Sequence, residues 1–199
     1  MSGWNGAVRT IIAIGASTGG PAAVAAILRE LPRLRACAVV IAQHLPGNFT
    51  ASFAERLDAQ SAWTVREARS GLEVEEACCY IAPGGRRTEI VADGDGLRCA
   101  VRPPAKADVY LPSIDALFAS VARLSKVWTI GVLLTGMGRD GVEGLRAIRE
   151  SGGFAIAEAA ETAVVDGMPR RAREAGFVDE IIPLGALARR LTELCQGRR

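Results

Sequence analysis

Three residues with reactive side chains, Ser17, His44 and Asp140, each follow closely on an apolar segment of the chain. Nucleophilic serine chemistry needs these three groups: a hydroxyl, a neutral imidazole within its reach, and a carboxylate that fixes the imidazole tautomer and stabilises the imidazolium. His44 is the single histidine among 199 residues. The three residues are far apart in sequence, so they form a triad only if the fold gathers them.

Each residue also has a structural interpretation that its local sequence supports. Ser17 lies among small residues before a helical pattern, where a serine is usually a turn or N-cap residue. His44 is a loop histidine that packs or caps locally in this interpretation, and Asp140 is a turn residue or the N-cap of a helix that begins at Gly141. Taken one residue at a time, the sequence leaves both interpretations open.

The spacing of apolar residues predicts the elements that position these side chains. Continuous apolar runs at residues 11–14, 36–42 and 128–134 predict buried strands, and helical spacing follows each of them. Short strand patterns at residues 64–67, 78–82, 88–91 and 97–101 predict hairpins at a sheet edge, with a turn at 93–96. The element order predicts a doubly wound α/β fold: a mainly parallel sheet flanked by helices, with a β-hairpin region at one edge.

This topology predicts that the three side chains meet. Ligands of open parallel sheets bind in the crevice beyond the carboxyl ends of the strands. Ser17, His44 and Asp140 follow three different predicted strands, so we expect them to line one crevice. Backbone N–H groups in the glycine-rich turns beside them are candidates for binding an oxyanion. The residues expected to line the site in this way are Thr18, Gly136, Met137 and Gly138.

A second hypothesis comes from a different class of protein. Residues 136–141 read G-M-G-R-D-G, a G-x-G-x-x-G pattern between a strand and a helix, and Glu158 lies about 20 residues on, where a ribose-binding carboxylate belongs. Against dinucleotide binding through Gly136, Gly138 and Gly141, Asp140 would place a carboxylate beside the pyrophosphate. Only residues 142–199 would remain to complete a cofactor domain.

Composition excludes several other classes. A net charge of +2 spread along the chain leaves no nucleic-acid footprint. The five cysteines form no C-x-x-C pair, so they predict neither a disulfide framework nor a zinc cluster, and they fit a reducing cytoplasm. Because no apolar run reaches the length of a signal peptide or membrane span, we expect no membrane insertion.

The chain resembles the catalytic domain of the CheB chemotaxis-receptor methylesterases. The resemblance covers about residues 11–194, and it implies that Ser17, His44 and Asp140 form the catalytic triad, with no metal or cofactor, in a doubly wound α/β domain. The motifs that carry it are, in order, I-G-A-S-T-G-G-P at 14–21, A-Q-H-L-P at 42–46 with F-T-A-S-F-A-E-R-L at 49–57, I-A-P-G-G at 81–85, L-L-T-G-M-G-R-D-G at 133–141 and V-V-D-G-M-P at 164–169.

The implied reaction is hydrolysis of glutamate methyl esters on the cytoplasmic helices of chemoreceptors, with release of methanol. Deamidation of receptor glutamines is a further activity of such enzymes. The implied partner is therefore a methylated receptor, and the implied location is the cytoplasm. A non-catalytic adaptor that keeps the fold and binds a receptor is a third hypothesis.

The chain also departs from the family pattern. We expect an extension at residues 1–10, a catalytic domain at 11–195 and a tail at 196–199. The usual member has a receiver domain before the catalytic one, so we expect a separate receiver or regulatory protein, a fragment or a stand-alone form. Other departures, outside the triad, bear on the choice of substrate or partner. They are Arg87 for a common histidine, Tyr110-Leu111 for histidine-arginine before Pro112-Ser113, and Ala159-Ala160 for an acidic pair.

Overall fold

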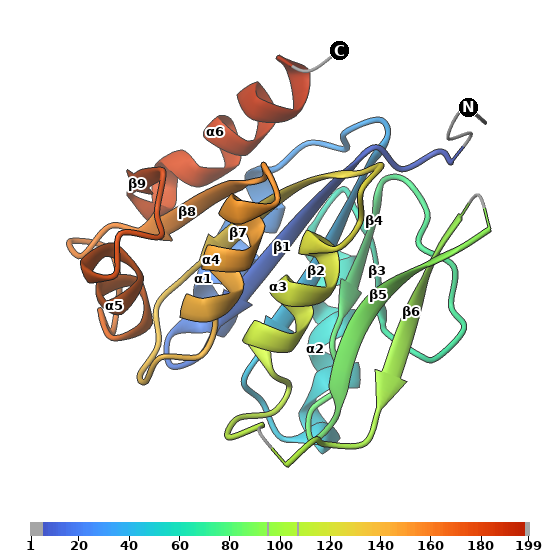
Figure 1. Cartoon of the computed structure of the whole chain (residues 1–199), viewed down its shortest axis with the longest axis horizontal. Helices are drawn as coiled ribbons and strands as arrows, with labels where there is room; N and C mark the ends of the chain where they lie inside the picture. Colours follow the sequence, from blue (N-terminus) through green and yellow to red (C-terminus); the bar gives the residue numbers. More distant parts are fainter. Residues whose placement is uncertain (1–5, 95, 107, 198–199) are drawn as a thin grey trace.

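The structure is a computed structural model that describes residues 6–94, 96–106 and 108–197, so parts of the predicted extension and tail lie outside it. Seven strands form its central sheet: β1 (Thr10–Ala16), β2 (Cys37–Gln43), β3 (Thr64–Glu67), β4 (Cys78–Ile81), β7 (Trp128–Leu133), β8 (Phe154–Glu158) and β9 (Glu180–Ile182). Their order is β3-β4-β2-β1-β7-β8-β9, and every neighbouring pair is parallel (Figure 1).

Helices cover both faces of this sheet. One face carries α1 (Gly20–Glu30), α2 (Gly47–Gln60) and α6 (Leu184–Gln196). The other carries α3 (Ile114–Ala122), α4 (Val142–Glu150) and α5 (Met168–Glu174), together with the two-stranded sheet of β5 (Arg87–Asp93) and β6 (Gly96–Arg102). The predicted doubly wound α/β fold is confirmed.

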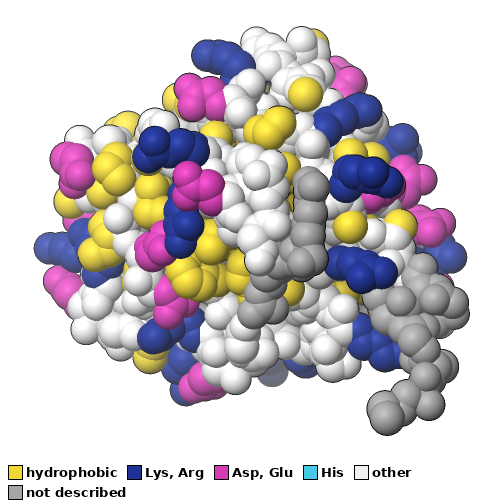
Figure 2. Space-filling view, turned by 90° about the horizontal axis from the view of Figure 1, so that it is seen from above, with side chains coloured by type: hydrophobic (Ala, Val, Ile, Leu, Met, Phe, Trp, Pro, Cys, Tyr) yellow, Lys and Arg dark blue, Asp and Glu magenta, His cyan; other side chains and the backbone are white. Residues whose placement is uncertain are grey.

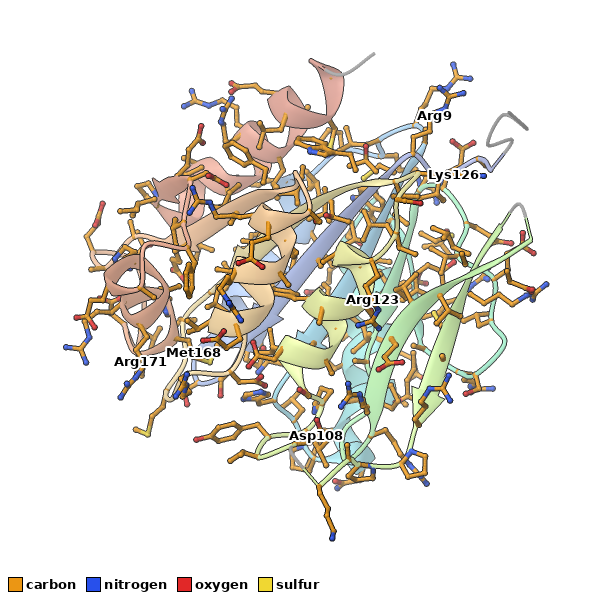
Figure 3. The ribbon with its side chains drawn as sticks, viewed as in Figure 1. Arg9, Asp108, Arg123, Lys126, Met168 and Arg171 are labelled. Atoms are coloured by element: carbon orange, nitrogen blue, oxygen red, sulfur yellow. The ribbon has the colours of Figure 1, made fainter. Side chains whose placement is uncertain are left out.

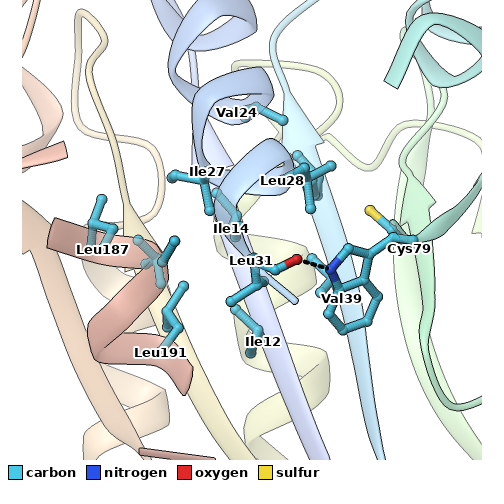
Figure 4. Close-up of a cluster of buried hydrophobic side chains, with 14 of the residues drawn as sticks. Ile12, Ile14, Val24, Ile27, Leu28, Leu31, Val39, Cys79, Leu187 and Leu191 are labelled. Atoms are coloured by element: carbon cyan, nitrogen blue, oxygen red, sulfur yellow. Dashed lines mark hydrogen bonds between the residues drawn. The ribbon is translucent and has the colours of Figure 1, made fainter. Parts of the chain in front are cut away.

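Alternation along β1 divides its side chains between two cores. Ile12 and Ile14 face α1 and α6, whereas Ile11 and Ala13 face the layer that contains α3. Every residue of β1 is buried because helices cover the strand on both sides, and Thr10 at its start is the one residue of the strand with a polar side chain. Figure 4 shows the first of these cores, where the indole of the buried Trp63 donates a hydrogen bond to the Leu31 carbonyl at 2.9 Å.

The structure corrects the prediction for residues 64–82. β3 and β4 do not form an edge hairpin, since they pair in parallel and extend the main sheet beyond β2. Runs this short carry no signal for strand direction; the chain returns through α2 to begin β3, and through the loop at residues 68–77 to begin β4 in the same direction. The second predicted hairpin is confirmed: Asp93 of β5 pairs with Gly96 of β6 across a turn whose residue 95 lies outside the described residues.

The order of the strands reverses between β1 and β7, because the chain proceeds from β1 to β2 on one side and from β7 to β8 on the other. The carboxyl ends of β1 and β7 therefore border the switch-point crevice of a doubly wound sheet. Asp108 and Met168 lie at this end of the molecule, and Arg9 and Lys126 lie at the other (Figure 3). Figure 2 views that other end and shows no histidine on it.

No helix in the described part of the chain is long and apolar enough to cross a membrane.

Candidate active site

Ser17 lies in the turn between β1 and α1, and its backbone is held from three sides. Its N–H donates to the Thr135 carbonyl at 3.0 Å, and its own carbonyl accepts from Gly20 N–H at 2.8 Å and from Gln43 Nε2 at 2.9 Å. The N-cap of α1 is Gly19, and no side chain caps this helix. The N-cap interpretation of Ser17 is therefore wrong: within the described residues its hydroxyl makes no hydrogen bond and stays available.

Two glycines allow other loops to pack against this turn. Gly19 has φ +83°, and a Cβ added there would lie 2.7 Å from Val164. A Cβ added at Gly136 would lie 2.6 Å from Cβ of Ser17. Both distances are shorter than real contacts allow, so the loop after β8 packs against Gly19, and the loop after β7 against Ser17, only because these positions lack side chains.

His44 stands beside Ser17 on the neighbouring strand. Ala16 of β1 pairs with Gln43 of β2, so the residue that follows each of them lies at adjacent positions of the sheet edge. His44 N–H continues this ladder by donating to the Ala16 carbonyl at 2.9 Å. The imidazole Nε2 lies 2.8 Å from Asp140 Oδ2, which leaves Nδ1 as its second ring nitrogen.

The structure therefore places Ser17 and His44 at adjacent strand ends and joins His44 to Asp140, which is one of the two contacts that the predicted triad requires. No hydrogen bond joins the Ser17 hydroxyl to His44 among the described residues. In enzymes without substrate this contact is often long and shortens in the complex. The imidazole and the carboxylate are 12% and 6% exposed, so their mutual contact is largely shielded from water.

Asp140 is also a helix cap, although of a different helix from the one its sequence suggests. Its Oδ2 accepts from Ile114 N–H at 2.8 Å and its Oδ1 accepts from Asp115 N–H at 2.9 Å, which are the first N–H groups of α3. The helix that follows Asp140, α4, has Gly141 at its N-cap. Because unpaired N–H groups and the helix dipole favour negative charge, the first turn of α3 stabilises this carboxylate as an anion.

The two helices cap each other. Asp115, in the first turn of α3, accepts at Oδ1 from Gly144 N–H of α4 at 2.7 Å, while Asp140 caps α3. Burial raises the pKa of Asp115 to about 6, and the nearby charge of Asp140 acts in the same direction. The exchange joins α3 rigidly to the turn that carries Asp140, so the position of this carboxylate does not depend on one flexible loop.

The predicted oxyanion donors differ in their availability. Gly136 N–H donates to the Val165 carbonyl at 2.9 Å, so this residue lines the site without offering a donor. The N–H groups of Thr18 and Met137 form no hydrogen bond within the described chain. Gly138, with φ +99°, turns the chain directly after Met137. Two free donors thus flank the Ser17 turn, one from the loop after β1 and one from the loop after β7.

Sequence reasoning missed the residues that hold these loops in place. Gln43 is 1% exposed, and its Nε2 bridges the Ser17 carbonyl and, at 3.3 Å, the His44 carbonyl. Thr135 donates through Oγ1 to the Thr18 carbonyl at 2.9 Å and accepts from Val165 N–H at 2.9 Å. The available signal was the polar residue type at Gln43, at the carboxyl end of the buried strand β2, and at Thr135, just after β7. A buried amide or hydroxyl is costly unless it forms hydrogen bonds, so such residues are expected to bind neighbouring backbone groups.

The dinucleotide hypothesis loses its two binding features in the structure. Glu158 is fully buried, and its carboxylate accepts from Thr135 N–H at 2.8 Å and from the Thr162 hydroxyl at 3.1 Å. Burial also raises the pKa of Glu158. The first turn of α4, where a pyrophosphate would bind, is already occupied by Asp115. No group of three or more metal-ligating side chains that could hold an ion occurs among the described residues.

Comparison with known proteins agrees with this geometry. Residues 12–191 match the family model for the CheB methylesterase. The chain belongs to the CheB methylesterase family. In addition, the crystal structure of the Thermotoga maritima CheB methylesterase catalytic domain superposes with a TM-score of 0.87 at 38% sequence identity, covering 92% of this chain and 97% of that one.

Several curated CheB relatives are similar over almost the whole chain. One from Desulfitobacterium hafniense is 43% identical over 189 residues and one from Geobacillus kaustophilus is 46% identical over 187 residues, each covering 94% of this chain. Both are named protein-glutamate methylesterase/protein-glutamine glutaminase. The match covers 48% and 54% of their own lengths, so the chain spans about half of these relatives.

The departures from the CheB pattern have definite places. Arg87 forms ion pairs with Glu89 at 2.9 Å and with Asp108 at 3.1 Å. Ala159 is buried after β8, where its N–H donates to the Ile182 carbonyl. Beside Asp140 lies a hollow of about 530 Å³, bounded by the loop before α3 and by the first turns of α3 and α4. Its lining includes Arg87, Asp108, Tyr110, Ser113, Asp115, Arg139 and Glu143.

Proposed function

We propose that this chain is a serine hydrolase that removes methyl esters from glutamate side chains of chemoreceptors and also deamidates receptor glutamines. The observation that carries the proposal is the 2.8 Å contact between His44 Nε2 and Asp140 Oδ2, which lies next to a free serine hydroxyl at the switch point of the sheet. The names of the curated relatives, protein-glutamate methylesterase/protein-glutamine glutaminase, support the same reaction class.

In this mechanism Ser17 Oγ attacks the ester carbonyl, and His44 takes the hydroxyl proton. Because Nε2 is bound to Asp140, the proton goes to Nδ1, and the imidazolium that forms is stabilised by the carboxylate. The tetrahedral oxyanion accepts hydrogen bonds from Thr18 and Met137 N–H. His44 then protonates the departing methoxide, and a water molecule activated by the same imidazole releases glutamate from Ser17. With a glutamine substrate the leaving group is ammonia.

The surface around the crevice supports a protein substrate. Single exposed apolar side chains are common on proteins, but a group of them around one site marks an interaction surface. Five of the six large apolar side chains described as exposed lie on segments at the carboxyl ends of the strands or on the loop before α3. We call this group the apolar rim; its members are Phe49, Val109, Tyr110, Met137 and Val164.

The rim fits a methylated receptor helix that presents one glutamate ester to the crevice. Such helices are cytoplasmic, so the proposal includes a cytoplasmic location. It also includes a catalytic domain at residues 11–195, with an extension at 1–10 and a tail at 196–199. The non-catalytic adaptor, the alternative from another class, predicts partner binding without any reaction at Ser17.

The test is methanol release from a methylated receptor. Ser17→Ala and His44→Gln should each lower kcat by about a thousandfold or more. The Ser17 hydroxyl and the His44 imidazole act as one unit in the proposed mechanism, so the loss of one disables both. Ser125→Ala, on an exposed serine at the far end of the molecule, is the matched control and should keep full activity. Full activity in Ser17→Ala would refute the mechanism. Receptor binding without reaction of Ser17 with a phosphonate would favour the adaptor.

A further inference from the structure

Tyr110 forms a contact with the proposed general base that the triad chemistry does not explain. Its ring stacks on the imidazole of His44, with ring centroids 5.3 Å apart and an interplanar angle of 16°. The contact uses a face of the imidazole, whereas Asp140 binds at its edge. Tyr110 is 41% exposed and lies on the loop before α3, so it is not a member of the hydrophobic core.

The loop that carries Tyr110 is braced from the β5–β6 sheet. The side chain of Asp108 is only 5% exposed; its Oδ1 accepts from Arg87 Nη1 at 3.1 Å, and its Oδ2 accepts from Ala105 N–H at 2.7 Å. Arg87 is held in turn by Glu89 of the same strand. A buried carboxylate that binds a backbone N–H and a guanidinium together is a rigid connection. The brace thus fixes the loop two residues before Tyr110.

The far end of the Tyr110 ring meets a second part of the site. A Cβ added at Gly138 would lie 3.2 Å from the Tyr110 hydroxyl oxygen, so this hydroxyl lies against the turn that follows Met137. The ring therefore spans from the imidazole of His44 to the loop that offers the Met137 N–H group. One side chain contacts the surroundings of both the base and an oxyanion donor.

We propose that Tyr110 is a positioning residue for His44 and that the Arg87–Asp108 ion pair holds it in place. The bond to Asp140 fixes one edge of the imidazole but permits rotation about the line through that bond. A ring stacked on the face resists this rotation, because turning the imidazole would break the contact. The stack thus holds the orientation of Nδ1, the nitrogen that takes the Ser17 proton in the proposed mechanism. This inference rests on the proposed function for its kinetic consequence and not for the stacking itself.

The stacking is tested first by NMR, which benefits from the single histidine of the chain. The carbon-bound imidazole protons of His44 lie over an aromatic ring and should therefore be shifted upfield. Tyr110→Ala should move these resonances downfield, and Tyr110→Phe should keep them in place. Ile181→Ala, which removes an exposed apolar side chain on the far strand β9, is the matched control and should change nothing. Unchanged His44 resonances in Tyr110→Ala would overturn the proposal.

The consequence for reactivity is tested by the rate at which a small phosphonate labels Ser17. Labelling needs the nucleophile and its base but no receptor. Tyr110→Ala should label roughly three- to tenfold more slowly, the range that the loss of one aromatic stack supports. Tyr110→Phe should label within about twofold of wild type, because the stack remains. Arg87→Gln should show an intermediate loss, and Arg66→Gln, which removes an exposed arginine of β3, should show none.

The outcomes separate this inference from the proposed function. A wild-type protein that labels, with Tyr110→Ala labelling equally fast, would overturn the positioning role and leave the serine hydrolase intact. A wild-type protein that does not label at Ser17 at all would overturn both. Circular dichroism of each variant confirms that it is folded before its rate is compared.

Discussion

Replacement of Asp140 by asparagine tests how one carboxylate serves both a helix and a base. Its Oδ2 accepts from His44 Nε2 and Ile114 N–H, and its Oδ1 accepts from Asp115 N–H. An asparagine has one oxygen and one NH₂ group where the aspartate has Oδ1 and Oδ2. Its NH₂ group is a donor, so at one of these two positions it must face an N–H group that is also a donor. The less costly orientation keeps the oxygen toward His44 and turns the NH₂ group toward Asp115 N–H.

The magnitudes follow from this orientation. One buried N–H group loses its acceptor, which costs about 1–3 kcal/mol of folding free energy. In the variant, the imidazolium of His44 that forms during catalysis no longer has the carboxylate charge of Asp140 beside it. For two unit charges about 4 Å apart at an effective dielectric constant of 20, this attraction is worth about 4 kcal/mol, or close to a thousandfold in rate. We therefore expect Asp140→Asn to lower kcat by roughly 10²–10⁴-fold while the protein stays folded.

The assay combines methanol release from methylated receptor with urea unfolding of the same preparation. Glu150→Gln, on an exposed carboxylate of α4, is the matched control and should change neither quantity appreciably. A variant that loses stability but keeps wild-type kcat would show that Asp140 is only a helix cap. A variant with unchanged stability would refute the inference that its oxygens satisfy the first turn of α3.

Two further predictions follow from the same site. Gly136→Ala should lower kcat by tenfold or more, because its Cβ would lie 2.6 Å from Cβ of Ser17 and displace the nucleophile, whereas Gly185→Ala, with no atom within 4 Å, should be harmless. Asp115→Asn should change how the free energy of unfolding depends on pH. Burial raises the pKa of Asp115 to about 6, so the folded protein holds this proton more tightly than the unfolded chain. The stability of the wild-type protein therefore falls as pH rises from about 4 to 6. Allowing for partial exposure, urea unfolding should show Asp115→Asn gaining about 2 kcal/mol on wild type between pH 4 and pH 7.5, and a constant difference would contradict this reasoning.

Strand and helix content was predictable where burial imposes a strong pattern. β1 and β2 are buried on both faces, so their residues are apolar or small without alternation, apart from Thr10 at the start of β1 and Gln43 at the end of β2, and this pattern is visible in the sequence. β3 and β4 have four residues each, which is too few to show whether a strand pairs in parallel or antiparallel. Their place in the main sheet depends on contacts with β2 that are distant in sequence.

The site shows the same division. The sequence alone determined that Ser17, His44 and Asp140 follow strands, and a parallel sheet collects the carboxyl ends of its strands at one edge whatever the loops contain. The small residues around Ser17 also indicated that other groups can approach this turn closely, whereas the atoms that do so at Gly19 and Gly136 were decided by the fold.

Only the tertiary structure decided which partners these side chains take. Asp140 caps α3 and not α4, the helix that follows it in the chain. The packing of α3 against α4 places the N–H groups of Ile114 and Asp115, at the start of α3, within hydrogen-bond distance of this carboxylate. Tyr110 reaches His44 because Arg87, on a separate sheet, braces its loop. Capping and stacking act over a few ångströms, so they depend on where whole elements pack, and local spacing in a sequence carries no information about that distance.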